Sequence, residues 1–199
     1  MQDTQNQNII ERAKETAIKL HQGQTRKDGS TPYYIHPEGV VQILEKYTDD
    51  ESIICAGWLH DTLEDVSGYS YEQLEKDFGK TVAGIVREVS EDKSPDDSRE
   101  KSIATWQARK TAYINNLEND SYGALMVSSA DKIHNMRSMM ELYERAGSRM
   151  WEAFNAPEPK IESIIWYYSE VISVLENKLK SGIVTEYRDV FENMKKLFK

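Results

Sequence analysis

Four side chains suited to binding a metal ion occur in three separated stretches of the sequence. His60 and Asp61 are adjacent in the string LHDTLED, His36 lies upstream in YYIHPEGV, and Asp131 lies downstream in SSADKIHNMRSM. Neighbouring side chains on a helix point about 100° apart, so an adjacent pair cannot face one apolar core together. Such a pair can instead hold one ion from two sides. Imidazole and carboxylate together suit manganese, iron or zinc. The sequence therefore predicts a divalent metal site with these four side chains as ligands.

Two further acids follow the His-Asp pair at helical spacing. Glu64 lies four residues after His60, and Asp65 lies four residues after Asp61. A continuous helix would place each acid one turn beyond a proposed ligand. A divalent ion can lower the pKa of water to near neutrality, and a nearby carboxylate can take the proton and pass it to a leaving group. We therefore predict Glu64 and Asp65 as catalytic residues.

Each string also has a simpler interpretation when it is taken alone. His36, directly before Pro37, could cap a helix, and HDTLED could be a solvated helix end. Asp131 fits such an interpretation less well, because it follows the apolar and neutral stretch ALMVSSA and a buried carboxylate needs partners. The prediction of a metal site rests on the joint occurrence of the strings. Asn135, one turn beyond Asp131, could hold that aspartate or bind a substrate.

Apolar residues at helical spacing run through the whole chain, without convincing strand alternation. Repeats, low-complexity tracts and domain linkers are absent, so we predict a single all-α domain over 1–199 with the metal site in the core of a helix bundle. The expected helices are 8–22, one opened by Pro37, 51–65, 70–78 with a restart after Gly79 to 89, 100–119, 122–145, 158–180 and 184–198, with loops at 23–36 and 91–99.

Composition narrows the classes of partner. A net charge of −9 argues against duplex nucleic acid, which normally requires a basic surface. The longest apolar run, IICAGWL, is far too short to span a membrane. The first ten residues lack the layout of a secretory signal, and Cys55 is the single cysteine, so we expect a cytoplasmic protein. The expected partner is a small molecule, and the chain could act alone or as a homo-oligomer.

Four strings, in order, resemble the HD-domain hydrolases of the RelA/SpoT type, and especially the stand-alone small alarmone hydrolases. They are HQGQTRKDGSTPYYIHP, AGWLHDTLEDV, FGKTVAGIVREVSEDKS and LMVSSADKIHNMRSM, and together they span 21–139. Helices over 147–199 would complete the domain. The resemblance implies hydrolysis of the 3′-pyrophosphate of guanosine tetra- or pentaphosphate (ppGpp or pppGpp) to pyrophosphate and GDP or GTP, usually with Mn²⁺. It also implies a hydrolase-only protein, since no synthetase domain follows.

The resemblance assigns roles residue by residue. His36, His60, Asp61 and Asp131 would be the metal ligands, Glu64 and Asp65 would handle the nucleophilic water, Arg26 and Lys27 would contact the base, and Asn135 would contact the sugar or phosphate. From the residues alone, a solvated turn is the favoured interpretation of TRKDG. Tyr33 and Tyr34 are more typical of a wall or core than of a ligand site, and His134 of a supporting hydrogen bond.

The sequence also departs from the family's commoner pattern. The usual string KLADRLHN reads SSADKIHN here, and Arg109 and Lys110 either reach a phosphate or lie on an exposed helix face, which we favour. These departures leave the base open, so (pp)pApp or another phosphorylated nucleotide such as NADPH is an alternative substrate. A non-catalytic nucleotide sensor is the alternative from another class, although it would be expected to have lost a ligand or an acid.

Overall fold

The computed structural model describes residues 8–91 and 98–198, and all regular elements within these ranges are helices. An isolated bridge between Thr25 and Pro32 is the single β-type contact there. The predicted all-α fold is confirmed, and the predicted loop at 91–99 falls largely outside the described ranges. The helices are α1 (Ile9–Leu20), α2 (Ile35–Leu44), α3 (Glu51–Leu59), α4 (Thr62–Asp65), α5 (Tyr71–Val89), α6 (Arg99–Ala104), α7 (Trp106–Leu117), α8 (Tyr122–Ala146), the 3₁₀ helix η1 (Gly147–Ala153), α9 (Lys160–Lys178) and α10 (Gly182–Leu197).

Local signals set several helix ends. The Asp50 carboxylate caps α3 by accepting from the backbone N–H of Ser52 at 2.8 Å, which satisfies a donor that the helix itself leaves unpaired. Ser70 caps α5 through the N–H of Gln73, as its spacing predicts. Gly79 interrupts α5 with φ 86°, a conformation that favours glycine, and the helix restarts after it.

The predicted helix over 51–65 is wrong in one respect, because it is broken at the His-Asp pair. α3 ends at Leu59 and the short α4 begins at Thr62. Two buried side chains occupy carbonyls at the end of α3: His60 Nδ1 donates to Gly57 O at 2.8 Å, and Thr62 Oγ1 donates to Leu59 O at 2.6 Å. These bonds replace backbone bonds that a continuous helix would make, so the chain turns here.

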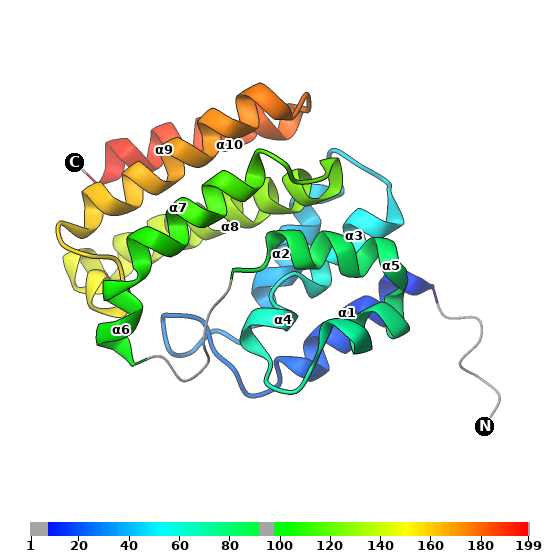
Figure 1. Ribbon diagram of the computed structural model, residues 1–199. Coiled ribbons are helices and arrows are strands. Elements are labelled where there is room, and N and C mark those ends of the chain that lie inside the picture. The colour runs from blue at the N-terminus through cyan, green and yellow to red at the C-terminus, as the bar shows by residue number, and fades with distance from the viewer. Residues whose placement is uncertain (1–7, 92–97, 199) are drawn as a thin grey trace.

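The long α8 forms the centre of the fold (Figure 1). It packs against α2, α3 and α5 on one side and against α9 and α10 on the other. Its buried residues include Met126, Ala130, Ile133 and Met136, which are fully enclosed. One continuous cluster of buried apolar side chains runs from Ala13 to Phe198. This continuity supports our proposal of a single domain, with α9 and α10 completing the core.

Two further differences concern helix boundaries elsewhere in the chain. The predicted helix over 100–119 is split at Thr105 into α6 and α7, where Thr105 Oγ1 donates back to the carbonyl of Lys101. The sequence pattern puts His36 just before a helix, but it is the second residue of α2, and Pro37 lies in the first turn, where proline is tolerated. Among the described residues, none of the helices has the length and apolar character needed to cross a membrane.

Candidate metal centre

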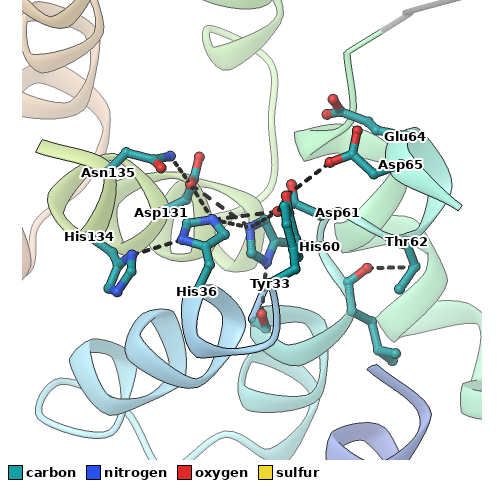
Figure 2. A network of polar contacts seen from close by, with 12 residues as sticks. Tyr33, His36, His60, Asp61, Thr62, Glu64, Asp65, Asp131, His134 and Asn135 are labelled. Atoms are coloured by element: carbon teal, nitrogen blue, oxygen red, sulfur yellow. Dashed lines mark hydrogen bonds and ion pairs between the residues drawn. The ribbon is translucent and has the colours of Figure 1, made fainter. Parts of the chain in front are cut away.

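The structure brings the four predicted ligands together in the core, although they come from different elements (Figure 2). His36, His60 and Asp131 each offer a ligand atom within 4.8 Å of the other two, and Asp61 lies beside the two histidines. His36 lies in the first turn of α2, His60 and Asp61 lie in the turn between α3 and α4, and Asp131 lies in α8. The Nε2 atoms of His36 and His60 are 3.2 Å apart. Asp61 Oδ2 lies 3.2 Å from Nε2 of His60 and 3.5 Å from Nε2 of His36. Asp131 Oδ1 lies 3.1 Å from the His36 nitrogen and 3.9 Å from the His60 nitrogen.

These distances fit a divalent cation. Ligand atoms about 2.0–2.2 Å from one ion lie about 3–3.5 Å from their neighbours in octahedral or tetrahedral geometry. The Nδ1–H of His60 is committed to Gly57 O, so in the neutral ring the lone pair is on Nε2 and faces the other ligands. His36 and His60 are 1% and 4% exposed, respectively. A divalent cation at this point would balance the buried carboxylates and bind the histidine nitrogens.

The electrostatics of the centre point the same way. Burial disfavours the ionised carboxyl of Asp131, but Lys132 and the ligand histidines outweigh it and hold its pKa well below the usual range. The pKa of Asp61 is likewise lowered, because His60 and His36 outweigh the effect of burial. Burial disfavours the imidazolium of His60, yet the Asp61 and Asp131 charges raise its pKa to about 9. A proton on His60 thus compensates part of the negative charge that a cation would balance.

Tyr33 is the first functional residue that the sequence interpretation missed, because its type and position are those of a wall residue. Its hydroxyl lies 2.6 Å from Oδ2 of Asp61 and 2.9 Å from Oδ2 of Asp65, so it donates to a predicted ligand and to a predicted catalytic acid. Burial and the Asp61 charge raise the pKa of Tyr33, which keeps the hydroxyl protonated as a donor. The ring of His21 stacks on the Tyr33 ring at 4.6 Å.

Glu64 and Asp65 lie on α4, on the Asp61 side of the centre (Figure 2). The backbone N–H of Glu91, which follows α5, donates to Oε1 of Glu64 at 2.7 Å. Each acid is therefore held by a group distant in the sequence, Asp65 by Tyr33 and Glu64 by Glu91. The predicted one-turn relation is present between Asp61 and Asp65, where the N–H of Asp65 donates to Asp61 O at 2.9 Å, although one continuous helix over 51–65 is not.

Arg26 and Asn135 reach the centre from the opposite side. Asn135 Nδ2 donates to Oδ1 of Asp131 at 2.5 Å, and Arg26 Nη2 donates to Oδ1 of Asn135 at 2.8 Å. The Arg26 guanidinium also lies over the Tyr33 ring, 5.5 Å from its centre. Lys27 lies farther out, with Nζ 4.1 Å from the centre of the Phe154 ring. Asn135 therefore joins the loop before α2 to a ligand on α8.

A cavity of about 840 Å³ opens at the centre, and the predicted ligands, acids and loop cations all line it. This volume is in the range of small-molecule sites. Its walls combine apolar and aromatic side chains with charges of both signs. The cationic lining residues include Arg26, Lys27, Arg109, Lys110 and Lys132, and the last three pair with Glu91 or Asp131. Guanidinium and aromatic groups suit a ligand with a flat ring, and the cations suit its phosphates.

Comparison with known proteins places the chain in a family. The model of the HD domain matches residues 13–154. The chain belongs to the HD domain family. It is 32% identical over 181 residues to guanosine-3′,5′-bis(diphosphate) 3′-pyrophosphohydrolase MESH1 of Xenopus tropicalis, covering 86% of this chain and 90% of that protein. The MESH1 of Drosophila melanogaster is 41% identical over 122 residues, 60% of this chain and 63% of that protein.

A solved structure agrees with this assignment. It is described as "A metazoan ortholog of SpoT hydrolyzes ppGpp and plays a role in starvation responses", and it superposes with a TM-score of 0.74 and 27% identity. The match covers 94% of this chain and 96% of that one. The resemblance to RelA/SpoT-type HD-domain hydrolases, predicted from the four strings, is thus confirmed.

The structure contradicts the expectation for two basic residues of α7. The favoured interpretation of Arg109 and Lys110 as an exposed face is wrong, because their side chains are 17% and 16% exposed and line the cavity. Both pair with the Glu91 carboxylate, Arg109 at 2.9 Å. The C-terminal aromatics Tyr167 and Tyr168 are buried and also line the cavity.

Lys132 is the second functional residue that the sequence interpretation missed. Its Nζ lies 2.5 Å from Oδ2 of Asp131 and 4.5 Å from the centre of the Tyr113 ring. Lys132 is 8% exposed, so its charge is compensated inside the protein. Oδ1 of Asp131 faces the histidines while Oδ2 faces Lys132. Only its place next to a predicted ligand in the string ADK could have drawn attention to it.

Proposed function

We propose that this HD-domain protein hydrolyses the 3′-pyrophosphate of guanosine tetra- or pentaphosphate and releases pyrophosphate and GDP or GTP. The observation that carries the proposal is the cluster of two histidines and two aspartates, with two more acids beside it, in a cavity that arginine and lysine side chains also line. The relatives in Xenopus and Drosophila carry this activity in their names, and the chain covers 90% of the first. One domain over 1–199 would hold the whole site.

We propose Mn²⁺ as the cofactor, held by His36, His60, Asp61 and Asp131. The mixture of imidazole and carboxylate ligands suits this ion. When bound, the ion would act as a Lewis acid toward the phosphoryl group and lower the pKa of the attacking water. The side chains around it would then orient the substrate and handle the proton.

Glu64 and Asp65 would manage that proton. The water oxygen forms a bond to the phosphorus next to the ribose, the bond from this phosphorus to O3′ breaks, and a proton passes to O3′. The two acids would take the proton from water and return it to the leaving group. Tyr33 keeps Asp65 facing Asp61, and the N–H of Glu91 fixes one oxygen of Glu64, so both carboxylates are held in place before substrate arrives.

The nucleotide would lie between the two walls of the cavity. A guanidinium can stack on a purine face, and an ammonium serves phosphate as a point charge. We therefore assign Arg26 and Lys27 to the base side and Asn135 to the sugar or phosphate. The Arg26 guanidinium already lies over an aromatic ring, 5.5 Å from the centre of Tyr33.

The setting of this activity is proposed as well. We propose a cytoplasmic enzyme that does not bind duplex nucleic acid. The single cysteine supports the first part of this proposal, and the net charge of −9 supports the second. The proposed substrate is a small nucleotide. It would bind in the cavity and not on the neutral or negative protein surfaces outside it. Assembly into a homo-oligomer is compatible with all of these proposals.

The test is product analysis with metal-stripped protein. It is incubated with ppGpp and, separately, with ppApp, with and without Mn²⁺, and the products are resolved by anion-exchange chromatography. Manganese-dependent release of pyrophosphate from ppGpp is expected. Release from ppApp alone would overturn the base assignment but keep the reaction. No release from either nucleotide would overturn the proposed reaction.

A further inference from the structure

The two ligand histidines are oriented by different kinds of partner. Nδ1 of His60 donates to the main-chain carbonyl of Gly57, only three positions away. Nδ1 of His36 instead lies 2.8 Å from Nδ1 of His134, a residue 98 positions away on α8 (Figure 2). A main-chain carbonyl is present whatever the side chain, whereas the partner of His36 depends on one residue type. The orientation of His36 can therefore be tested by substitution.

When Nε2 of His36 binds a cation, the hydrogen bond between the two rings assigns the proton on each. Nε2 of His36 faces Nε2 of His60 at 3.2 Å and Oδ1 of Asp131 at 3.1 Å, so its lone pair must lie on that side to bind a cation. The proton of the neutral ring is then on Nδ1 and is donated to His134. Nδ1 of His134 must accept, which leaves the His134 proton on Nε2. His134 thus acts as a hydrogen-bond acceptor for the ligand.

Gly39 makes room for the ring of His134. A Cβ atom at Gly39 would lie 2.2 Å from Cδ2 and 2.3 Å from Nε2 of His134, far inside van der Waals contact. Gly39 lies one turn after His36 on α2, so α2 supplies both the ligand and the space for the ring that orients it. Any side chain at position 39 would displace His134 from His36.

We propose that His134 is a positioning residue of the metal centre, which fixes the tautomer and ring angle of His36, and that Gly39 is required because it leaves space for the His134 ring. This proposal rests on the proposed function, since it concerns the same metal site. Partners of this kind typically change metal affinity by about 10–100-fold. The effect should therefore appear in binding of the metal alone, before any nucleotide is added.

The experiment measures Mn²⁺ affinity of the metal-stripped full chain by isothermal titration calorimetry without nucleotide. His134→Phe keeps a ring but removes the acceptor, and should weaken binding by about 10–100-fold. His134→Asn places an amide oxygen near the former Nδ1 and should retain most of the affinity. Ser138→Ala, one turn farther along α8 on the same cavity wall, is the matched control and should bind as the wild type does.

A double-mutant cycle tests the role of Gly39. Gly39→Ala should weaken Mn²⁺ binding in the wild type but should have little further effect in a His134→Ala background, because the added methyl then has space. Thermal unfolding of the metal-free variants checks that each is folded. If His134→Phe does not fold, His134→Asn and the cycle decide the outcome.

The outcomes separate the two proposals. Wild-type affinity in folded His134→Phe, or equal losses for Gly39→Ala in both backgrounds, would overturn the role of His134 and leave the proposed reaction standing. Failure of the wild type to bind Mn²⁺ would overturn the metal-dependent reaction and this inference together. Weak binding by His134→Phe with recovery in His134→Asn would support the inference, whichever nucleotide proves to be the substrate.

Discussion

The two sides of the metal centre are built in different ways. The local side consists of His60, Asp61 and Thr62, in which the side chains of His60 and Thr62 bond to carbonyls three positions away. The long-range side consists of His36 and Asp131 with their partners, and its bonds join residues 98 and 109 positions apart. The local side can form as soon as α3 ends. The long-range side exists only when α2 packs on α8.

This difference predicts which side fails first. Local hydrogen bonds are present whenever the turn after α3 is folded, so they resist changes elsewhere in the core. The long-range side depends on the relative position of α2 and α8, and a small shift between these helices would separate ligand from partner. Loss of a partner that orients His36 at the long-range side should therefore alter metal binding, whereas loss of the Thr62 hydrogen bond at the local side should mainly alter stability.

Asp61 faces both sides, so its removal should have the largest effect. Asp61→Ala should lower turnover by about a thousandfold or more, since a Lewis acid supplies several kcal/mol and each 1.36 kcal/mol is a factor of ten. The fold should survive, because the helices that carry the other ligands are unchanged. Release of pyrophosphate in Mn²⁺-replete buffer and circular dichroism measure the two quantities. Turnover near that of the wild type would refute the ligand assignment.

Lys132→Met tests the long-range side by removing the ammonium group that pairs with Oδ2 of Asp131. The substitution leaves a buried carboxylate without its cation, so the free energy of unfolding should fall by about 3–5 kcal/mol in the metal-free protein. Added Mn²⁺ should restore more stability to the variant than to the wild type, because it balances the same charge. Urea unfolding with and without the metal measures this. An equal response of the two proteins to Mn²⁺ would contradict the role of Lys132.

Tyr33→Phe probes the link between the local side and the acids of α4. Loss of the hydroxyl frees both Asp61 and Asp65, and kcat should fall by about 10–100-fold, the usual effect of a supporting partner. The neighbouring Tyr34→Phe is the matched control and should leave kcat unchanged. Equal losses of activity in Tyr33→Phe and Tyr34→Phe would refute the proposed role of the Tyr33 hydroxyl.

Thr62→Val tests whether the local side is independent. The hydroxyl is fully buried and donates to Leu59 O, so its loss should cost about 1–3 kcal/mol of stability. Mn²⁺ affinity of the folded variant should match that of the wild type, because His60 keeps its bond to Gly57. Urea unfolding and metal titration together provide the measurement. A loss of affinity as large as that of His134→Phe would remove the distinction between the two sides.

The smallest expected effect concerns the loop that carries Arg26. The hydroxyl and N–H of Thr31 and the N–H of Ser30 donate to Asp28 and lower its pKa to about 2. The folded pKa is below the unfolded value of about 3.9, so this stabilisation is complete above that value and is lost as the pH falls toward 2. Asp28→Asn should therefore flatten the acid limb of the stability profile. An unchanged profile in acid titrations would contradict this account.

Features that depend on neighbours in the chain could be predicted from the sequence. The all-α fold, the cap of α5 by Ser70 and the restart after Gly79 follow from spacing and residue type. The His-Asp pair also drew attention to His36 and Asp131 as candidate ligands, which the structure brings close to it. These features are local because a cap or a backbone conformation is decided within a few residues.

Other features required the tertiary structure. The break between α3 and α4 arises from buried bonds of His60 and Thr62 that helical periodicity does not reveal. Tyr33 has an ordinary residue type for a core, and the supporting hydrogen bond expected of His134 has its partner on another helix, so only packing between distant segments brings these two side chains to Asp61 and His36. The sequence determined which groups could bind a metal and transfer a proton. Tertiary packing decided which groups hold them in place, because those hydrogen bonds join segments that meet only in the folded protein.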